Sequence, residues 1–129
     1  MSGIKYLLDT NYILGLLQSN QEVLSDAISK NILVTECAYS PITRMELLGF
    51  TGITSDEDNL IRARLKSFTV IPLSTEIEDS VIALRQSRKI KLPDAMIAAT
   101  ALVTKIELLT LDQHLKSIVT QHNLNAIPI

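Results

Sequence analysis

The sequence of 129 residues lacks the features of disulfide-rich and membrane-spanning proteins. Its single cysteine, Cys37, has no second cysteine in the chain with which to form a disulfide. No uninterrupted apolar run approaches the roughly 20 residues that a membrane-spanning helix needs, and residues 1–8 lack the apolar stretch of a secretory signal. We therefore expect a cytoplasmic protein whose hydrophobic residues, 47% of the chain, form a core or a partner interface.

Glycine and proline are also scarce, with four of each in the chain. No internal repeat, low-complexity tract or Gly/Ser-rich linker interrupts the sequence. A chain of this length is typical of one ordinary domain that can bury its own hydrophobic core. We therefore expect residues 1–129 to form a single domain that carries the whole function.

An excess of positive charge is missing as well, since 12 basic residues stand against 14 acidic ones and the net charge is -2. Domains that bind nucleic acid by bulk electrostatics usually show a strong basic excess, so this mode of binding is disfavoured. A nuclease is not excluded, because carboxylates gathered around a metal ion would add much of the negative charge. Basic residues cluster only locally, and such clusters are most often solvated helix surface. The two clusters are Arg62, Arg64 and Lys66, and Arg85, Arg88, Lys89 and Lys91.

Hydrophobic periodicity predicts strands that alternate with helices. Short apolar or β-branched runs predict strands at residues 5–8, 32–35, 68–73 and 107–111, with a further edge strand at 126–128. Apolar spacing and capping residues predict helices at 12–18, 21–30, 41–48, 55–67, 75–88, 95–104 and 112–119. This alternation predicts an α/β fold with a mainly parallel central sheet covered by helices on both faces.

Four acidic residues stand out because apolar residues surround them, whereas most other acids lie in polar helix turns. They are Asp9, Glu46, Asp94 and Asp112. Burying an unpaired carboxylate is costly, so an acid of this kind pairs with a cation, caps a helix or holds a metal. Each has an ordinary alternative when taken singly. Asp9 could lie in a turn, Glu46 could be an exposed helix acid, Asp94 could satisfy a helix dipole and Asp112 could be an N-cap.

The order of strands and helices predicts that these four carboxylates come together. In right-handed strand-helix-strand units, every strand ends and every following helix begins at the same edge of the sheet. Asp9 and Asp112 follow predicted strands, and Asp94 and Glu46 lie in the first and second turns of predicted helices. Oxygen ligands suit magnesium or manganese and disfavour zinc. The pattern therefore predicts a site for metal-assisted phosphodiester hydrolysis.

Neither histidine belongs to this pattern. His114 stands two residues beyond the last of the four acids, and His122 is isolated in the sequence. Both are interpreted as ordinary surface residues rather than metal ligands.

The segments around the four acids resemble the motifs of the PIN-domain family, and specifically of the VapC-type toxin ribonucleases of bacterial toxin-antitoxin pairs. These segments are LLDTN at 7–11, SPITRMELLG at 40–49, LPDAMIAATA at 92–101 and LTLD at 109–112. The resemblance implies a three-layer α/β/α sandwich and cleavage of RNA with Mg²⁺ or Mn²⁺ as the cofactor. It also implies a cognate VapB-like antitoxin as a partner and a homodimer.

The same resemblance implies roles for single residues. Asp9, Glu46, Asp94 and Asp112 match the catalytic and metal-binding acids of the family, with Asp9 and Asp94 as direct metal ligands, and we call these four residues the acidic quartet. Asn11, Thr43 and Thr110 match polar positions that orient carboxylates or water. Independently of the resemblance, the second basic cluster could hold the RNA backbone through phosphate contacts, and Arg85 is the candidate residue in it. Leu115 departs from the family, whose members often carry an aromatic residue there.

Two other classes of function remain as alternatives. Another magnesium-dependent phosphoryl hydrolase would normally need a lysine near its acids, and none stands within the four motifs. A Gly-rich phosphate-binding loop of the Walker type is absent too. A non-catalytic PIN-fold binding module would keep the fold and use only its apolar surface, which the intact quartet disfavours.

Overall fold

The computed structural model describes residues 3–125, which fold into an alternating series of strands and helices. The strands are β1 (Tyr6–Leu8), β2 (Cys37–Tyr39), β3 (Thr69–Val70) and β4 (Glu107–Leu109). The helices are α1 (Thr10–Leu17), α2 (Gln21–Ser29), α3 (Pro41–Leu48), α4 (Ser55–Leu65), α5 (Thr75–Ser87), α6 (Leu92–Thr104) and α7 (Gln113–Asn125). A short 3-10 helix, η1 (Val34–Glu36), precedes β2.

The four strands form one parallel sheet in the order β3-β2-β1-β4. The chain builds β1, β2 and β3 toward one side and then returns to place β4 on the other side of β1. Leu8 of β1 pairs with Leu109 of β4, so these two strands end level with each other. The point where strand order reverses therefore lies between β1 and β4, and open parallel sheets bind ligands at such a point.

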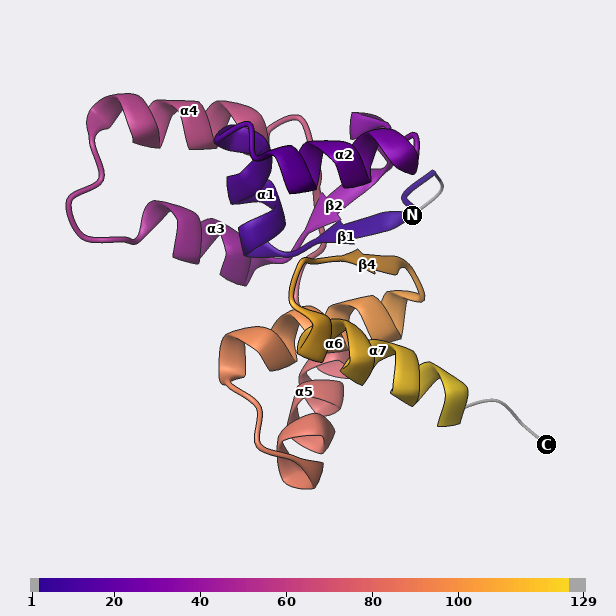
Figure 1. Ribbon diagram of the computed structural model, residues 1–129. Helices are drawn as coiled ribbons and strands as arrows, with labels where there is room; N and C mark the ends of the chain where they lie inside the picture. Colours follow the sequence, from indigo (N-terminus) through magenta and orange to yellow (C-terminus); the bar gives the residue numbers. More distant parts are fainter. Residues whose placement is uncertain (1–2, 126–129) are drawn as a thin grey trace.

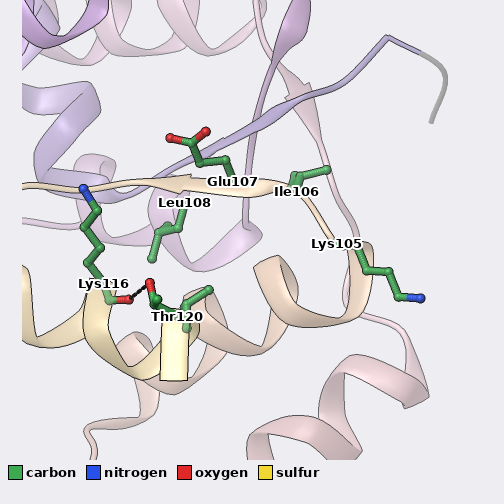
Figure 2. A pocket seen from close by; sticks show the side chains of 7 residues that line it. Lys105, Ile106, Glu107, Leu108, Lys116 and Thr120 are labelled. Atoms are coloured by element: carbon green, nitrogen blue, oxygen red, sulfur yellow. Dashed lines mark hydrogen bonds between the residues drawn. The ribbon is translucent and has the colours of Figure 1, made fainter. Parts of the chain in front are cut away.

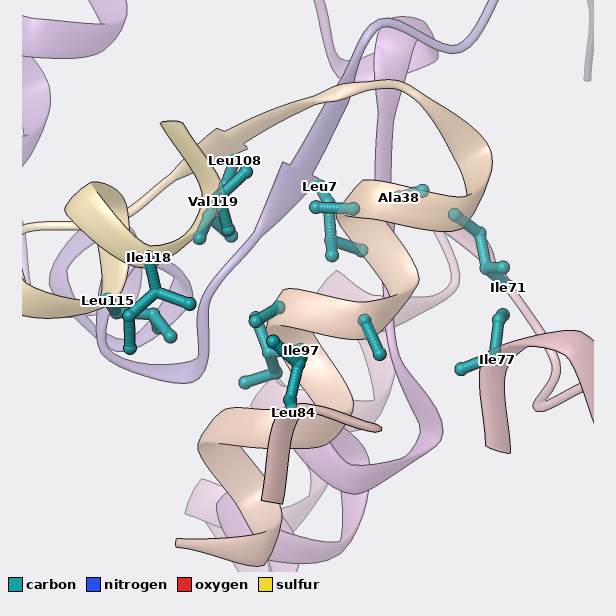
Figure 3. Close-up of a cluster of buried hydrophobic side chains, with 13 residues drawn as sticks. Leu7, Ala38, Ile71, Ile77, Leu84, Ile97, Leu108, Leu115, Ile118 and Val119 are labelled. Carbon is teal, nitrogen blue, oxygen red and sulfur yellow. The ribbon is translucent and has the colours of Figure 1, made fainter. Parts of the chain in front are cut away.

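Alternate side chains of each strand point to opposite faces, and each face is covered by helices (Figure 1). Leu7, Ala38 and Leu108 pack in one buried cluster with α5, α6 and α7, which Figure 3 shows. Leu8, Tyr39 and Leu109 pack in a second cluster with α1, α2, α3 and α4. The predicted α/β/α sandwich around a mainly parallel sheet is confirmed.

Helix α6 is the most apolar support of the sheet. Its buried residues include four alanines, Ala95, Ala98, Ala99 and Ala101, whose small side chains allow close packing. It lies among α5, α7 and the sheet (Figure 1), and packs most extensively on α5. None of the helices in residues 3–125 has the length and apolar character of a membrane-spanning segment.

The second strand lies closer to the C-terminus than the sequence predicts. The prediction of a strand at residues 32–35 is wrong, because η1 begins at Val34 and the strand is Cys37–Tyr39. Leu33 and Val34 remain 59% and 47% exposed, whereas all three residues of β2 are buried. Burial between the two helical layers, rather than β-branched composition, thus decides where this strand forms.

The remaining differences concern the ends of elements. Helix α1 begins at Thr10 rather than at residue 12, and α6 begins at Leu92, with a proline in its first turn. Helix α7 continues to Asn125, and β3 keeps only two of the six residues predicted for it. The edge strand predicted at 126–128 lies outside the described residues.

Candidate functional site

The acidic quartet lies at the edge of the sheet where the parallel strands end. Asp9 directly follows β1, and Asp112 follows β4 after a short turn. Asp94 is the third residue of α6, and Glu46 lies in the second turn of α3. Because β1 and β4 are neighbours and end level, the acids after these strands lie beside the reversal point of the sheet.

Asp9 is the buried member of the quartet, with 6% of its surface exposed. Its Oδ1 accepts a hydrogen bond from the backbone N–H of Thr10 at 2.8 Å, and its Oδ2 accepts one from the Thr110 hydroxyl at 2.7 Å. Burial raises the pKa of Asp9, and the negative charges of Asp94 and Asp112 raise it further. The two hydrogen bonds offset part of this rise, because they stabilise the ionised form.

Asp94 is half-buried and shares the negative potential of the site. Burial is the largest cause of its raised pKa, followed by the charges of Asp112 and Glu46. The positive charges of Lys91 and His114 act in the opposite direction. Asp94 therefore interacts electrostatically with each of the other three acids, and Asp9 also interacts with Asp112.

Asp112 also caps a helix. Its Oδ1 accepts hydrogen bonds from the backbone N–H groups of His114 and Leu115, at 3.0 and 3.1 Å, at the start of α7. Its own backbone N–H donates to the Thr110 hydroxyl at 3.0 Å. The N-cap alternative raised from the sequence thus describes one real role of Asp112, and this role engages only one of its carboxylate oxygens.

Glu46 is exposed and is held by a threonine that sequence reasoning did not single out. The hydroxyl of Thr10 donates to Glu46 Oε1 at 2.7 Å and lies 2.9 Å from the hydroxyl of Thr43, which is fully buried. The available signal was the position of Thr10 next to Asp9, at the first turn of α1. Thr43 and Thr110 therefore both join the hydrogen-bonded network of the quartet.

The other predicted polar residues lie outside this network. Asn11 is exposed on α1 and makes no hydrogen bond to the quartet. Arg85 is exposed near the end of α5. Within the basic cluster 85–91, Lys91 immediately precedes α6 and is the residue whose charge acts on Asp94. His114 is exposed, as expected, yet it lies near enough to affect Asp94.

The donor set of the site fits a hard divalent cation. None of the ion pairs found in residues 3–125 includes a member of the quartet. The groups available are carboxylate and hydroxyl oxygens, which magnesium and manganese prefer. No three acidic, histidine or cysteine side chains in the described part of the chain are drawn together as a ready-made metal cluster. The carboxylates of the quartet repel one another, so only a cation that balances their charge would allow them to approach more closely.

An apolar groove opens beside the quartet between α1, α3 and α4. It has a volume of about 590 Å³, and Thr10, Asn11 and Glu46 form its polar end. Its apolar wall includes Phe50 and Leu60, which are 45% and 52% exposed. A separate hollow of about 460 Å³ lies between α7 and the beginning of β4 (Figure 2). None of the quartet lines that second hollow.

Comparison with known proteins identifies relatives that cover most of the chain. The family model described as PIN domain matches residues 6–120. A solved toxin-antitoxin complex from Klebsiella pneumoniae contains a chain 32% identical to this one, with a TM-score of 0.72. The match covers 84% of this chain and 88% of that chain. No curated protein sequence matches significantly.

Two more distant structures share the fold. FitAcB from Neisseria gonorrhoeae is 24% identical, with a TM-score of 0.70, over 89% of this chain and 93% of that chain. VapBC2 from Rickettsia felis, bound to a DNA fragment from their promoter, is 21% identical, with the same TM-score and the same coverage of both chains.

Proposed function

This chain belongs to the PIN-domain family, and on that basis we propose that it is a magnesium- or manganese-dependent endoribonuclease, the toxin of a VapBC-type toxin-antitoxin pair. The observation that carries the proposal is the acidic quartet at the reversal point of the sheet, with no cationic side chain paired to it in residues 3–125. Structural similarity to a toxin-antitoxin complex supports the biological setting.

Asp9 and Asp94 would hold the cation, with Glu46 and Asp112 as further ligands or as acceptors for its water molecules. A divalent ion bound there supplies positive charge to the attacked phosphate and makes a bound water more acidic. The chain itself fixes the carboxylates, because the hydroxyl of Thr110 and the backbone N–H of Thr10 hold both oxygens of Asp9. Burial is the main cause of the raised pKa values of Asp9 and Asp94, and neighbouring carboxylates raise both values further, so a cation bound among these acids would be favoured.

The RNA backbone would be held by exposed cations near the quartet. Within the basic cluster, Lys91 is the residue whose charge lowers the pKa of Asp94, and Arg85 lies in the last turn of α5. Phosphate contacts of this kind position a strand without reading its sequence. These basic residues would therefore attract RNA locally, although the chain as a whole carries a net negative charge.

Two protein partners complete the proposal. The apolar groove beside the quartet would receive an antitoxin segment, since a partner seated there lies next to Glu46 and blocks access to the acids. A second copy of the chain would cover the apolar hollow between α5 and α6, where Ile82 and Leu92 are 53% and 46% exposed. Exposed apolar residues gathered in this way are typical of protein interfaces.

The decisive experiment is cleavage of structured RNA with MgCl₂ or MnCl₂, comparing wild type with Asp9→Asn and Asp94→Asn. Wild type should cleave and each variant should lose at least about 100-fold in rate, because each loses a charged ligand of the metal. Cleavage that persists in EDTA, or in both variants, would contradict the metal site. Absence of any cleavage in wild type would favour the non-catalytic binding module.

In the same assay, the coexpressed product of a short reading frame beside this gene should inhibit cleavage if it is the antitoxin.

A further inference from the structure

The hydroxyls of Thr10 and Thr43 lie side by side in the site, and the hydroxyl of Thr10 also contacts Glu46, which lies on a different helix from Thr10. Thr10, the first residue of α1, donates its hydroxyl proton to Glu46 Oε1 on α3, at 2.7 Å. We propose that Thr10 is a positioning residue that holds the Glu46 carboxylate in place for metal binding. This inference rests on the proposed function, because it takes Glu46 to be part of the metal site.

The direction of the hydrogen bonds follows from the number of protons available. An ionised carboxylate can only accept, so the single hydroxyl proton of Thr10 is used in the bond to Glu46. The 2.9 Å contact between the hydroxyls of Thr10 and Thr43 must then have Thr43 as the donor. Thr43 is fully buried, and this bond gives its hydroxyl proton an acceptor. The chain of bonds therefore runs from Thr43 through Thr10 to Glu46.

Glu46 needs such a restraint more than the other acids do. It is exposed on the surface of α3 and has no ion-pair partner among the described residues. A free glutamate side chain samples many rotamers, and fixing it in one of them costs conformational entropy. When a hydroxyl already holds the carboxylate, much of this cost no longer has to be met on binding a cation.

Thr10 also connects two acids that come from different elements. Its backbone N–H donates to Asp9 Oδ1 at 2.8 Å, while its side chain donates to Glu46. One residue at the start of α1 thus ties the buried acid after β1 to the exposed acid on α3. Asp9 has a second donor in Thr110, whereas Glu46 accepts its side-chain hydrogen bond only from Thr10 among residues 3–125. Loss of the Thr10 hydroxyl should therefore affect Glu46 first.

The test measures binding of Mn²⁺ by isothermal titration calorimetry, without RNA. Thr10→Val, which removes the hydroxyl and keeps the shape, should weaken Mn²⁺ binding by about tenfold, as is typical for partners of metal ligands. Thr10→Ser keeps the hydroxyl and should bind within about twofold of wild type. The matched control is Thr120→Val, which removes an exposed α7 hydroxyl that donates only to the Lys116 carbonyl, and it should bind as wild type does.

A double-mutant cycle with Glu46→Ala separates positioning from a general structural effect. If Thr10 acts through Glu46, adding Thr10→Val to Glu46→Ala should cause little further loss of Mn²⁺ affinity. Equal losses in both backgrounds, or equal behaviour of Thr10→Val and Thr10→Ser, would refute the assignment. Should Thr10→Val melt below the assay temperature, Thr10→Ala removes the same hydroxyl and carries the same expectations.

The same titrations tell this inference apart from the proposed function. If wild type binds Mn²⁺, Asp9→Asn abolishes binding and Thr10→Val binds as wild type does, the role of Thr10 is wrong and the metal site stands. If wild type itself binds no Mn²⁺, the metal site of the proposed function is wrong, and the role of Thr10 falls with it.

Discussion

At the scale of single residues, Asp112 combines a structural and a proposed chemical role. One oxygen of its carboxylate accepts two backbone N–H groups at the start of α7. Its negative charge also raises the pKa values of Asp9 and Asp94. A cap needs only an oxygen acceptor, whereas a metal ligand benefits from the charge. Substitutions that keep the oxygen but remove the charge can therefore separate these roles.

We expect Asp112→Asn to keep the stability of wild type within about 0.5 kcal/mol, because asparagine caps helices as well as aspartate does. Asp112→Ala should lower the free energy of unfolding by about 1 kcal/mol, since it leaves the two N–H groups without this acceptor. Both variants should cleave RNA more slowly than wild type. Urea denaturation measures stability and the RNA assay measures activity. An asparagine variant with full activity would mean that Asp112 serves only as a cap.

The residues that flank the quartet show how far a sequence can specify a site. The four acids could be selected because each interrupts apolar sequence. Thr10 could not be separated from an ordinary helix-start threonine, because its two hydroxyl partners lie 33 and 36 residues away in the chain. Arg85 was selected from a cluster of basic residues, yet Lys91 is the member of that cluster whose charge acts on Asp94. Only the packing of the helices distinguishes these residues from their neighbours.

At the scale of elements, α5 and α6 present an apolar surface that their own sequences only partly explain. Val81 and Leu84 of α5 pack into the molecule, but Ile82 is 53% exposed and lines the hollow shared with Leu92 and Met96. An amphipathic helix that buries its apolar stripe needs no apolar residue at an exposed position. We therefore assign the contact of the proposed homodimer to this surface.

The proposed homodimer should dissociate into monomers in Ile82→Lys, because the lysine places a charge in a surface that would have to be dehydrated on association. Fold stability should change little, since the side chain is already half exposed. Size-exclusion chromatography with light scattering gives the mass of each form. Arg62→Ala, an exposed substitution on α4 that breaks only an ion pair with Asp58, is a control expected to stay dimeric. A wild-type monomer would contradict this assignment of the surface.

At the scale of the whole molecule, the burial of Asp9 and Asp94 and the negative charges beside them make the stability of the fold depend on pH. In the folded state, the pKa values of Asp9 and Asp94 are raised above the ordinary value of an aspartate. A raised carboxyl pKa contributes stability that is full below the unfolded value and is lost as pH rises through the folded value. At neutral pH, ionisation of both acids therefore disfavours the metal-free fold, and a bound cation should reverse this effect.

In EDTA at pH 7, Asp9→Asn should melt a few degrees above wild type, because the asparagine removes the buried charge. Its amide oxygen can still accept from the Thr10 N–H, and its amide N–H can donate to the Thr110 hydroxyl in place of the present bond. Adding MnCl₂ at about 100 times its Kd should stabilise wild type by about 2.7 kcal/mol and leave Asp9→Asn unchanged. In EDTA, the advantage of Asp9→Asn should shrink as the pH falls through the raised pKa of Asp9. Differential scanning calorimetry measures these shifts. Equal stabilisation of both proteins by Mn²⁺ would place the ion elsewhere.

The sequence by itself determined the alternation of strands and helices, the parallel sheet and the four acids at its edge, because periodicity, caps and chain direction are local properties. Tertiary structure decided the position of the second strand, where burial of Cys37–Tyr39 prevailed over the β-branched residues before it. It also decided that β1 lies beside β4 and that Thr10 meets Glu46. These contacts join segments far apart in the chain, so they depend on how the layers pack, which no local pattern records.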